Sequence, residues 1–227
     1  MVKTLKYKSP PRPARRLPVA SLQRWQAACE AVGARGDAGV YRQLVSAWSA
    51  RSRHYHSLTH LEACLRELEE ARSVIAEPAM VELALWFHDA IYRTYRRDNE
   101  ERSAEWAEAA LCKLGATPET GARISTYILA TKHGQQSVSG DAAYVVDIDL
   151  SILGEAPAVY DGFEQQVRRE YWWVGRKRFA RARLAVLDSF LARSSIYSTP
   201  LFKDRYEDSA RDNLARAIDT LKEAVGG

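Results

Sequence analysis

The stretch PAMVELALWFHD spans residues 78–89 and predicts the centre of the fold. Pro78 suits the first turn of a helix, where a backbone N–H has no partner in any case. The residues that follow, 80–87, are apolar almost all round, which predicts a helix buried on every side. His88 and Asp89 come next, and a buried carboxylate beside an imidazole is costly to desolvate without a partner. A divalent cation is such a partner, because it offsets the negative charge and binds neutral imidazole.

Helical periodicity continues on both sides of this stretch. Apolar residues from Leu61 to Leu68 recur at the i, i+3, i+4 and i+7 spacing of one helix face, within a helix predicted at about 57–74. Residues 144–148 are the one candidate strand, but they are short and lack a partner strand, so a helix is predicted there too. The other predicted helices lie at about residues 21–32, 40–48, 98–114, 117–129, 143–153, 157–174, 177–192 and 207–225.

Two candidate helix starts and one charged helix face are also visible in the sequence. The segments Thr59–Glu62 and Asp98–Glu101 each fit a capping box at a helix start. Arg168, Arg169 and Glu170 are expected to lie on a solvated helix face, as such charged runs usually do.

These elements predict an all-α fold, with a single helical domain at residues 19–227 packed around the central buried helix. Residues 1–18 hold four prolines among basic residues, and we expect them to form a flexible basic arm. An electrostatic contact of this arm with a polyanion is the alternative.

The composition of the chain limits which binding partners and which cellular compartment are expected. A net charge of +4 and a pI near 9.0 indicate a mild preference for anions, and nucleic acid is not expected as a partner because no recognition-helix motif is present. Cys29, Cys64 and Cys112 form no C-x-x-C pair and are interpreted as buried apolar residues of a reducing compartment. No apolar run reaches the ~20 residues of a membrane span, and no apolar segment follows the basic N-terminus as in a secretory signal. We therefore expect a cytoplasmic protein with no membrane partner.

Histidines and aspartates are few and gather in three places. His56 and His60 lie in the loop and the first turn of the helix predicted at 57–74, and either could be a ligand. His88 and Asp89 follow the apolar helix. Asp147 and Asp149 interrupt an apolar stretch farther along the chain, where buried acids again need a cation or a helix cap. The order of a histidine, a His-Asp pair and a distant aspartate on successive helices is more specific than any one of these features.

The residues resemble the HD-domain superfamily of metal-dependent phosphohydrolases. The resemblance covers roughly residues 50 to 220, most of the folded chain. It is carried by the segments YHSLTHL (55–61), WFHDAIY (86–92), DNEERSA (98–104) and VDIDLSILG (146–154). The chain is most similar to a bacterial subgroup of predicted HD-type phosphohydrolases. The resemblance implies a helical domain of HD type in which the His-Asp pair binds metal.

The resemblance implies His88 and Asp89 as ligands without ambiguity. For the early histidine, His60 is favoured over His56, because apolar residues follow it in helical register. For the distant aspartate, Asp149 is favoured over Asp147. The two acids are two residues apart and point in nearly opposite directions on a helix, so one ion is not expected to bind both. His133 is a candidate for a further ligand or a phosphate contact, and the alternative is a polar residue at a helix C-terminus.

The expected reaction is hydrolysis of a phosphate ester, of a nucleotide or similar small molecule, by a water that one divalent metal activates. The metal is one of Mn, Fe, Co, Ni, Zn or Mg, which the sequence does not distinguish. Asp89 is expected to accept a proton, Glu100 or Glu101 to protonate the leaving group, and Lys132 and Arg93 to bind phosphate.

Departures from better-known relatives narrow the expectation. Asp89 is not followed by the E-D of alarmone hydrolases or by the glutamate of 5′-deoxynucleotidases, and the G-Y-P signature of cyclic-di-GMP enzymes is missing. The alternative function is a metal- or nucleotide-binding regulatory module without significant turnover. The sequence leaves open whether the chain forms a homo-oligomer.

Overall fold

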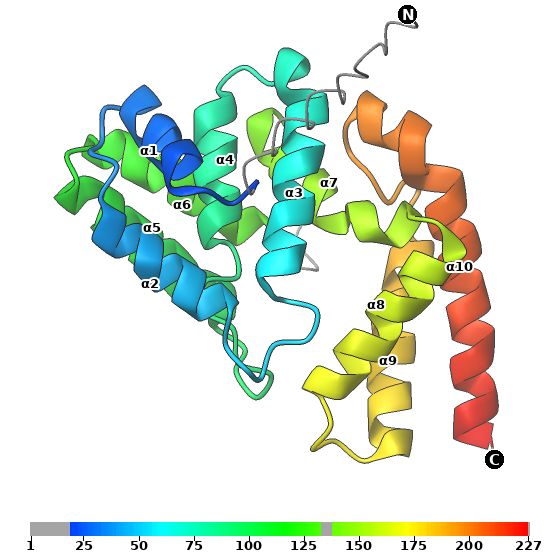
Figure 1. Ribbon diagram of the computed structural model, residues 1–227. Coiled ribbons are helices and arrows are strands. Elements are labelled where there is room, and N and C mark those ends of the chain that lie inside the picture. Colours follow the sequence, from blue (N-terminus) through cyan, green and yellow to red (C-terminus); the bar gives the residue numbers. More distant parts are fainter. Residues whose placement is uncertain (1–18, 133–137, 227) are drawn as a thin grey trace, which may run out of the picture.

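The computed structural model describes residues 19–132 and 138–226 of the chain (Figure 1). Within these ranges the backbone is largely helical and contains no strand, which confirms the predicted all-α fold. The predicted arm at residues 1–18 and the candidate ligand His133 lie outside the described residues. None of the described helices is both long enough and apolar enough to span a membrane. The α-helices are α1 (Leu22–Ala31), α2 (Ala38–Trp48), α3 (Leu58–Ala71), α4 (Pro78–Phe87), α5 (Asn99–Lys113), α6 (Pro118–Ala130), α7 (Asp141–Asp149), α8 (Pro157–Glu170), α9 (Arg176–Leu191) and α10 (Pro200–Gly226), with 3-10 helices η1 (Arg72–Val74) and η2 (Leu150–Gly154).

Helix α4 is the central buried helix that its sequence predicts. Residues Met80–Phe87 are all buried, and the helix packs against α1, α3, α5, α6 and α7. Near its end the Trp86 ring meets the Trp25 ring of α1 edge-on, with 5.7 Å between ring centroids. The only charged residue of α4, Glu82, is buried and accepts a hydrogen bond from Arg24 at 2.8 Å. The helix thus buries a single charge, and that charge is paired.

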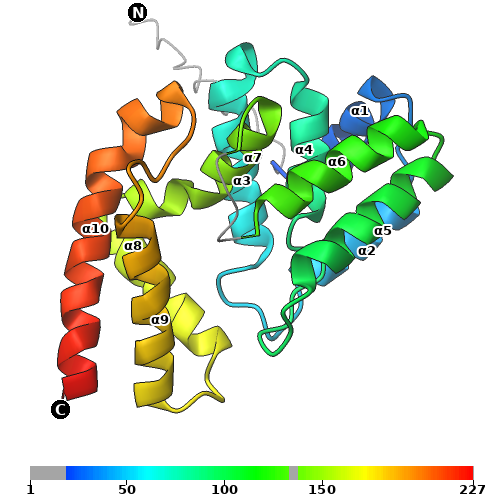
Figure 2. The same ribbon diagram turned by 180° about the vertical axis from the view of Figure 1, so that it is seen from behind.

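The remaining helices lie on either side of α3 and α7. Helix α10 packs against α9 and η2, and the ion pairs Arg183–Glu164 and Arg216–Asp161 join α8 to α9 and α10 (Figure 1). Helices α5 and α6 pack together at the other end of the molecule, which Figure 2 shows from behind. Between them α7 contacts α3, α4 and α6, and one hydrophobic core connects these elements.

The two predicted capping boxes are wrong. Asp98 precedes α5 but makes no cap hydrogen bond, because its carboxylate pairs with Arg96 at 2.7 Å and with Arg102 at 2.8 Å. Thr59 lies inside α3, whose N-cap is Ser57. Charge-assisted bonds to arginine are stronger than a bond to a neutral backbone N–H, so they decide where the Asp98 carboxylate points.

Two helix boundaries differ from the predicted ones for a structural reason. The helix predicted at 143–153 ends at Asp149 and continues as η2. Helix α10 begins at Pro200, well before the predicted residue 207. The carboxylate of Asp147 accepts the backbone N–H groups of Ser198 at 2.9 Å and Thr199 at 2.7 Å, just before that helix. This acceptor comes from a helix 51 residues earlier, so no local pattern reveals it.

Candidate metal centre

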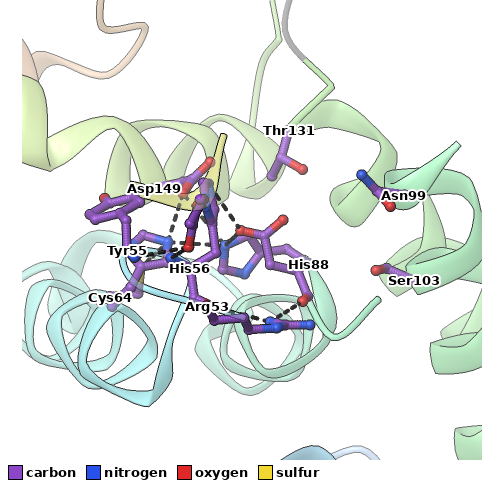
Figure 3. A network of polar contacts seen from close by, with 12 residues as sticks. Arg53, Tyr55, His56, Cys64, His88, Asn99, Ser103, Thr131 and Asp149 are labelled. Carbon is purple, nitrogen blue, oxygen red and sulfur yellow. Dashed lines mark hydrogen bonds and ion pairs between the residues drawn. The ribbon is translucent and has the colours of Figure 1, made fainter. Parts of the chain in front are cut away.

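Three helices bring imidazole and carboxylate groups to one buried point (Figure 3). His60 lies in the first turn of α3, His88 directly follows α4, and Asp149 is the last residue of α7. The Nε2 atom of His60 is 3.3 Å from Nε2 of His88 and 3.1 Å from Oδ1 of Asp149. The same Asp149 oxygen is 3.4 Å from Nε2 of His88. The three atoms therefore form a nearly equilateral triangle.

The side of this triangle matches the spacing of atoms that share one cation. Nitrogen and oxygen ligands at about 2.0–2.2 Å from a metal ion lie roughly 2.8–3.6 Å from each other, depending on whether the geometry is octahedral or tetrahedral. The three distances among His60, His88 and Asp149 fall within that range. The residues therefore fit a divalent cation bound by nitrogen and oxygen atoms.

Asp89 supplies a further oxygen on the same side of His88. Its Oδ2 atom is 3.3 Å from Nε2 of His88 and 4.0 Å from Nε2 of His56. Burial opposes ionisation of this carboxyl group, but the attraction of His88 and His56 outweighs it and holds the pKa of Asp89 well below its ordinary value. The Asp89 carboxylate is therefore an anionic group next to His88, outside the four residues whose ligand atoms all lie within 4.8 Å of one another.

The surroundings of His88 favour a positive charge at Nε2. Its Nδ1 atom lies 2.9 Å from the carbonyl oxygen of Leu85, an arrangement in which Nδ1–H donates and Nε2 faces the carboxylates. Burial lowers the pKa of His88, but Asp89 and Asp149 raise it by more than burial lowers it. The net pKa is therefore well above its ordinary value. For His60, by contrast, burial dominates and lowers the pKa. The two carboxylate oxygens near Nε2 of His88 therefore favour a positive charge at this point.

Cys64 belongs to the same group of atoms, which the sequence analysis missed. Its Sγ atom is 3.6 Å from Nε2 of His60, and one ligand atom each from His60, Cys64, His88 and Asp149 lie within 4.8 Å of one another. Burial and the charges of Asp149 and Asp89 raise the pKa of the thiol well above its ordinary value. The sequence signal was present as the four-residue spacing from His60, which places both side chains on one helix face.

His56 lies beside the triangle and is held by Glu170. Its Nδ1 atom is 2.6 Å from Oε2 of Glu170, and its ring stacks on Tyr92 at 4.0 Å between centroids. The other Glu170 oxygen accepts the backbone N–H groups of His54 at 2.7 Å, Tyr55 at 2.9 Å and His56 at 3.0 Å. The expectation of a solvated Glu170 is therefore wrong, because its side chain is 0% exposed and fixes the loop before α3.

Arg53 ties that loop to the residues after α4. Its guanidinium group donates to the carbonyl oxygens of His56 at 3.1 Å, Asp89 at 2.7 Å and Ala90 at 2.9 Å. Although burial lowers the pKa of Arg53, the nearby Asp89 and Glu170 carboxylates oppose that effect. Sequence reasoning missed this residue as well, since an arginine in a polar loop gives no sign of burial.

Asp147 does not join the candidate ligands. Its side chain is fully buried and its carboxylate is used at the start of α10, as described above. Of the two aspartates left open by the sequence, the structure brings Asp149 to His60 and His88.

The residues expected to act on substrate are not part of the converging ligand group. Lys132 forms an ion pair with Glu101, and Arg93 is exposed in the loop between α4 and α5. Glu100 is partly buried, and burial together with the charge of Asp89 raises its pKa above its ordinary value. Glu100 therefore retains a proton to higher pH than an exposed glutamate does.

A cavity of about 350 Å³ lies beside His60 and Cys64, between α3, η2 and α8. Its walls combine the apolar side chains of Ile152 and Phe163 with polar groups such as Arg66. This volume is at the lower end of the range for small-molecule sites.

No protein-family model matches the chain, and no curated protein or solved structure is significantly similar to it. A function for the chain is therefore argued from the geometry of the site and from the motif resemblance.

Proposed function

We propose that the chain is a metal-dependent phosphohydrolase of the HD-domain type, which hydrolyses a phosphate ester of a nucleotide or a similar small molecule. The observation that carries the proposal is the convergence of His60, His88 and Asp149 at ligand spacing, with Asp89 beside them. These residues occur in the chain order that the superfamily motif requires, with His60 in α3, His88 and Asp89 directly after α4, and Asp149 in α7.

The proposed ligands are His60, His88, Asp89 and Asp149. A divalent cation supplies Lewis-acid polarisation of a phosphoryl oxygen and lowers the pKa of a water molecule. The carboxylates of Asp89 and Asp149 are each 15% exposed, and their two negative charges balance the charge of a bound divalent cation.

Protein side chains perform the proton transfers in this proposal. Asp89 is anionic and faces both His88 and His56, so it is placed to orient the attacking water and accept its proton. Glu100 has a raised pKa near Asp89 and is the proposed donor to the leaving oxygen. Lys132 and Arg93 are the proposed phosphate contacts, and Lys132 must exchange its partner Glu101 for the substrate.

The test combines metal content with turnover. The purified protein is analysed for bound metal and then screened with nucleotides and simple phosphate esters, with and without added manganese, cobalt or zinc. Metal-dependent phosphate release that is lost in Asp89→Ala, and retained in the exposed control Asp188→Ala, supports the proposal.

Two other outcomes contradict it in different ways. Stoichiometric metal without turnover across the panel favours a metal- or nucleotide-binding regulatory module. Failure of the wild-type protein to bind any of these metals after reconstitution removes the basis for the metal centre itself.

A further inference from the structure

Exposed aromatic side chains gather on two segments that touch each other. These segments are the loop between α4 and α5, at residues 91–98, and the turn between α8 and α9, at residues 171–175. In the described part of the chain, the large aromatic side chains that are exposed are Tyr95 at 72%, Trp172 at 78% and Trp173 at 49%. The Nε1–H group of Trp173 donates to Oγ1 of Thr94 at 2.9 Å, so the two segments are in contact. Figure 1 and Figure 2 show both segments at the same end of the molecule.

Basic side chains accompany these rings, and acids are missing from the same stretches of sequence. Residues 90–97 contain three arginines and no acid, and residues 171–183 contain four arginines, one lysine and no acid. The exposed basic residues of these stretches that form no ion pair with another described residue include Arg93, Arg97, Arg176, Lys177 and Arg178. Together with the three exposed rings, these five residues define what we call the aromatic-basic surface.

The aromatic-basic surface begins beside the candidate metal centre. The loop at 91–98 includes Tyr92, whose ring stacks on His56 at 4.0 Å between centroids. The turn at 171–175 directly follows Glu170, whose carboxylate is 2.6 Å from Nδ1 of His56. Both segments therefore start at contacts of His56, which lies beside the ligand triangle. A ligand bound along the surface is thus adjacent to the centre.

Rings among unpaired arginines fit the chemistry of single-stranded nucleic acid. Unpaired bases stack on aromatic side chains, and the guanidinium group binds phosphate through two parallel N–H donors. The Trp173 ring is held by Thr94 and stacks on Tyr171 at 6.5 Å between centroids, so part of the platform is ordered before any ligand binds. Single strands are bound without a recognition helix, so the lack of that motif in the sequence does not exclude them.

An anionic membrane also attracts basic and aromatic side chains, but the surface fits it less well. Insertion into lipid is driven by burial of apolar area, to which aliphatic side chains contribute strongly. The large aliphatic side chains that are exposed in the described part of the chain, Val74, Val159 and Val186, all lie outside the two segments. The surface therefore offers rings and arginines without an aliphatic wedge.

We propose that the aromatic-basic surface binds single-stranded nucleic acid, with bases stacked on Trp172 and Trp173 and phosphates bound by the surrounding arginines. The inference goes beyond the proposed function, because it concerns binding and needs no metal ion. It assigns the polyanion to the two segments at 91–98 and 171–178, and not to the basic residues at 1–18.

Fluorescence anisotropy measures the binding with metal-free, full-length protein. The probe is a fluorescein-labelled oligothymidylate of about 20 nucleotides, longer than the ~4–16 nucleotides of typical single-strand sites. We expect the wild type to bind it with an affinity that falls as the salt concentration rises, because binding releases counterions from the strand. A duplex of the same length should bind more weakly, since its bases are already stacked on each other. Vesicles of equal parts phosphatidylcholine and phosphatidylserine test the membrane alternative by co-sedimentation.

Substitutions on the surface are compared with matched controls elsewhere. Trp172→Ala should weaken oligothymidylate binding about 5- to 150-fold, the range for the loss of one stacked base, and Trp172→Phe should lose less because a ring remains. The control Val74→Ala, 55% exposed in η1, should leave the affinity unchanged. Arg176→Ala should reduce the slope of log affinity against log salt by about 1, whereas Arg35→Ala, exposed between α1 and α2, should not change it. Circular dichroism verifies that each variant is folded.

Several results would overturn the proposal. One is the absence of oligothymidylate binding by the wild type at low salt, with or without binding to the vesicles. Another is tighter binding of the duplex than of the single strand. A third is strand binding that neither Trp172→Ala nor Arg176→Ala weakens, which would place the polyanion on another part of the chain. Metal-dependent hydrolysis of small phosphate esters without strand binding overturns this inference alone, and strand binding by a protein that holds no metal overturns only the proposed function.

Discussion

Replacing Glu170 with alanine tests whether the buried carboxylate holds the loop before α3. The Glu170 side chain is 0% exposed and accepts hydrogen bonds from three consecutive backbone N–H groups and from the His56 ring. The alanine variant loses the acceptor for all four donors. A buried donor left without a partner costs about 1–3 kcal/mol. Because His56 is 20% exposed, water reaches part of the space and reduces the total.

We therefore expect Glu170→Ala to lower the free energy of unfolding by about 3–5 kcal/mol, in the range seen when a buried charged partner is removed. Urea denaturation followed by circular dichroism measures this difference. The control is Gln165→Ala, an exposed position on the same helix, for which we expect a change within about 0.5 kcal/mol. Glu170→Gln keeps one oxygen acceptor and should fall between the two. A loss below about 1 kcal/mol in Glu170→Ala would refute the structural role, because that value is less than the cost of one unpaired donor.

Three further results are expected. Burial raises the pKa of Glu170, but the hydrogen bonds from His56 and the backbone outweigh burial, so the net pKa is lowered. The stability that the Glu170 carboxylate contributes is complete above its ordinary pKa of 4.5 and is lost as the pH falls through the folded-state pKa. Denaturation curves of the wild type and Glu170→Gln should therefore converge in acid, and a difference that stays constant with pH would contradict this. Arg53→Ala should lower stability by about 2–4 kcal/mol, because three carbonyl groups lose a charged donor, and Arg53→Lys should not restore it, since an ammonium group lacks the planar fork. Zinc at 100 times the dissociation constant of the wild type should stabilise the wild type by about 2.7 kcal/mol in thermal denaturation. An equal gain in His88→Ala at the same zinc concentration would exclude His88 as a ligand.

The sequence predicts the helices and the central position of α4 because those features depend on local patterns. Apolar residues from Met80 to Phe87 leave no polar face for solvent, so burial follows from the segment alone. The boundary at Pro200 is different, because it depends on Asp147 in another helix. Local patterns cannot reveal an acceptor that the fold brings from a distant segment.

The same distinction applies to the candidate site. His60, His88 and Asp149 were proposed from motif order, and the structure brings them together. Glu170 was assigned to a solvated face, although its partner His56 lies 114 residues earlier in the chain. Cys64 was interpreted as an apolar residue because three dispersed cysteines form no motif among themselves.

The position of Glu170 has a consequence for biosynthesis. All the candidate ligands, from His60 to Asp149, leave the ribosome before Glu170 does, since synthesis proceeds from the N-terminus. A nascent chain that ends before α8 contains the complete ligand set but lacks the carboxylate that fixes the backbone of His54, Tyr55 and His56. The loop before α3 therefore gains its contacts with Glu170 only after α8 has docked. A truncated product would therefore carry the ligands of α3, α4 and α7, but the loop before α3 would lack its Glu170 contacts.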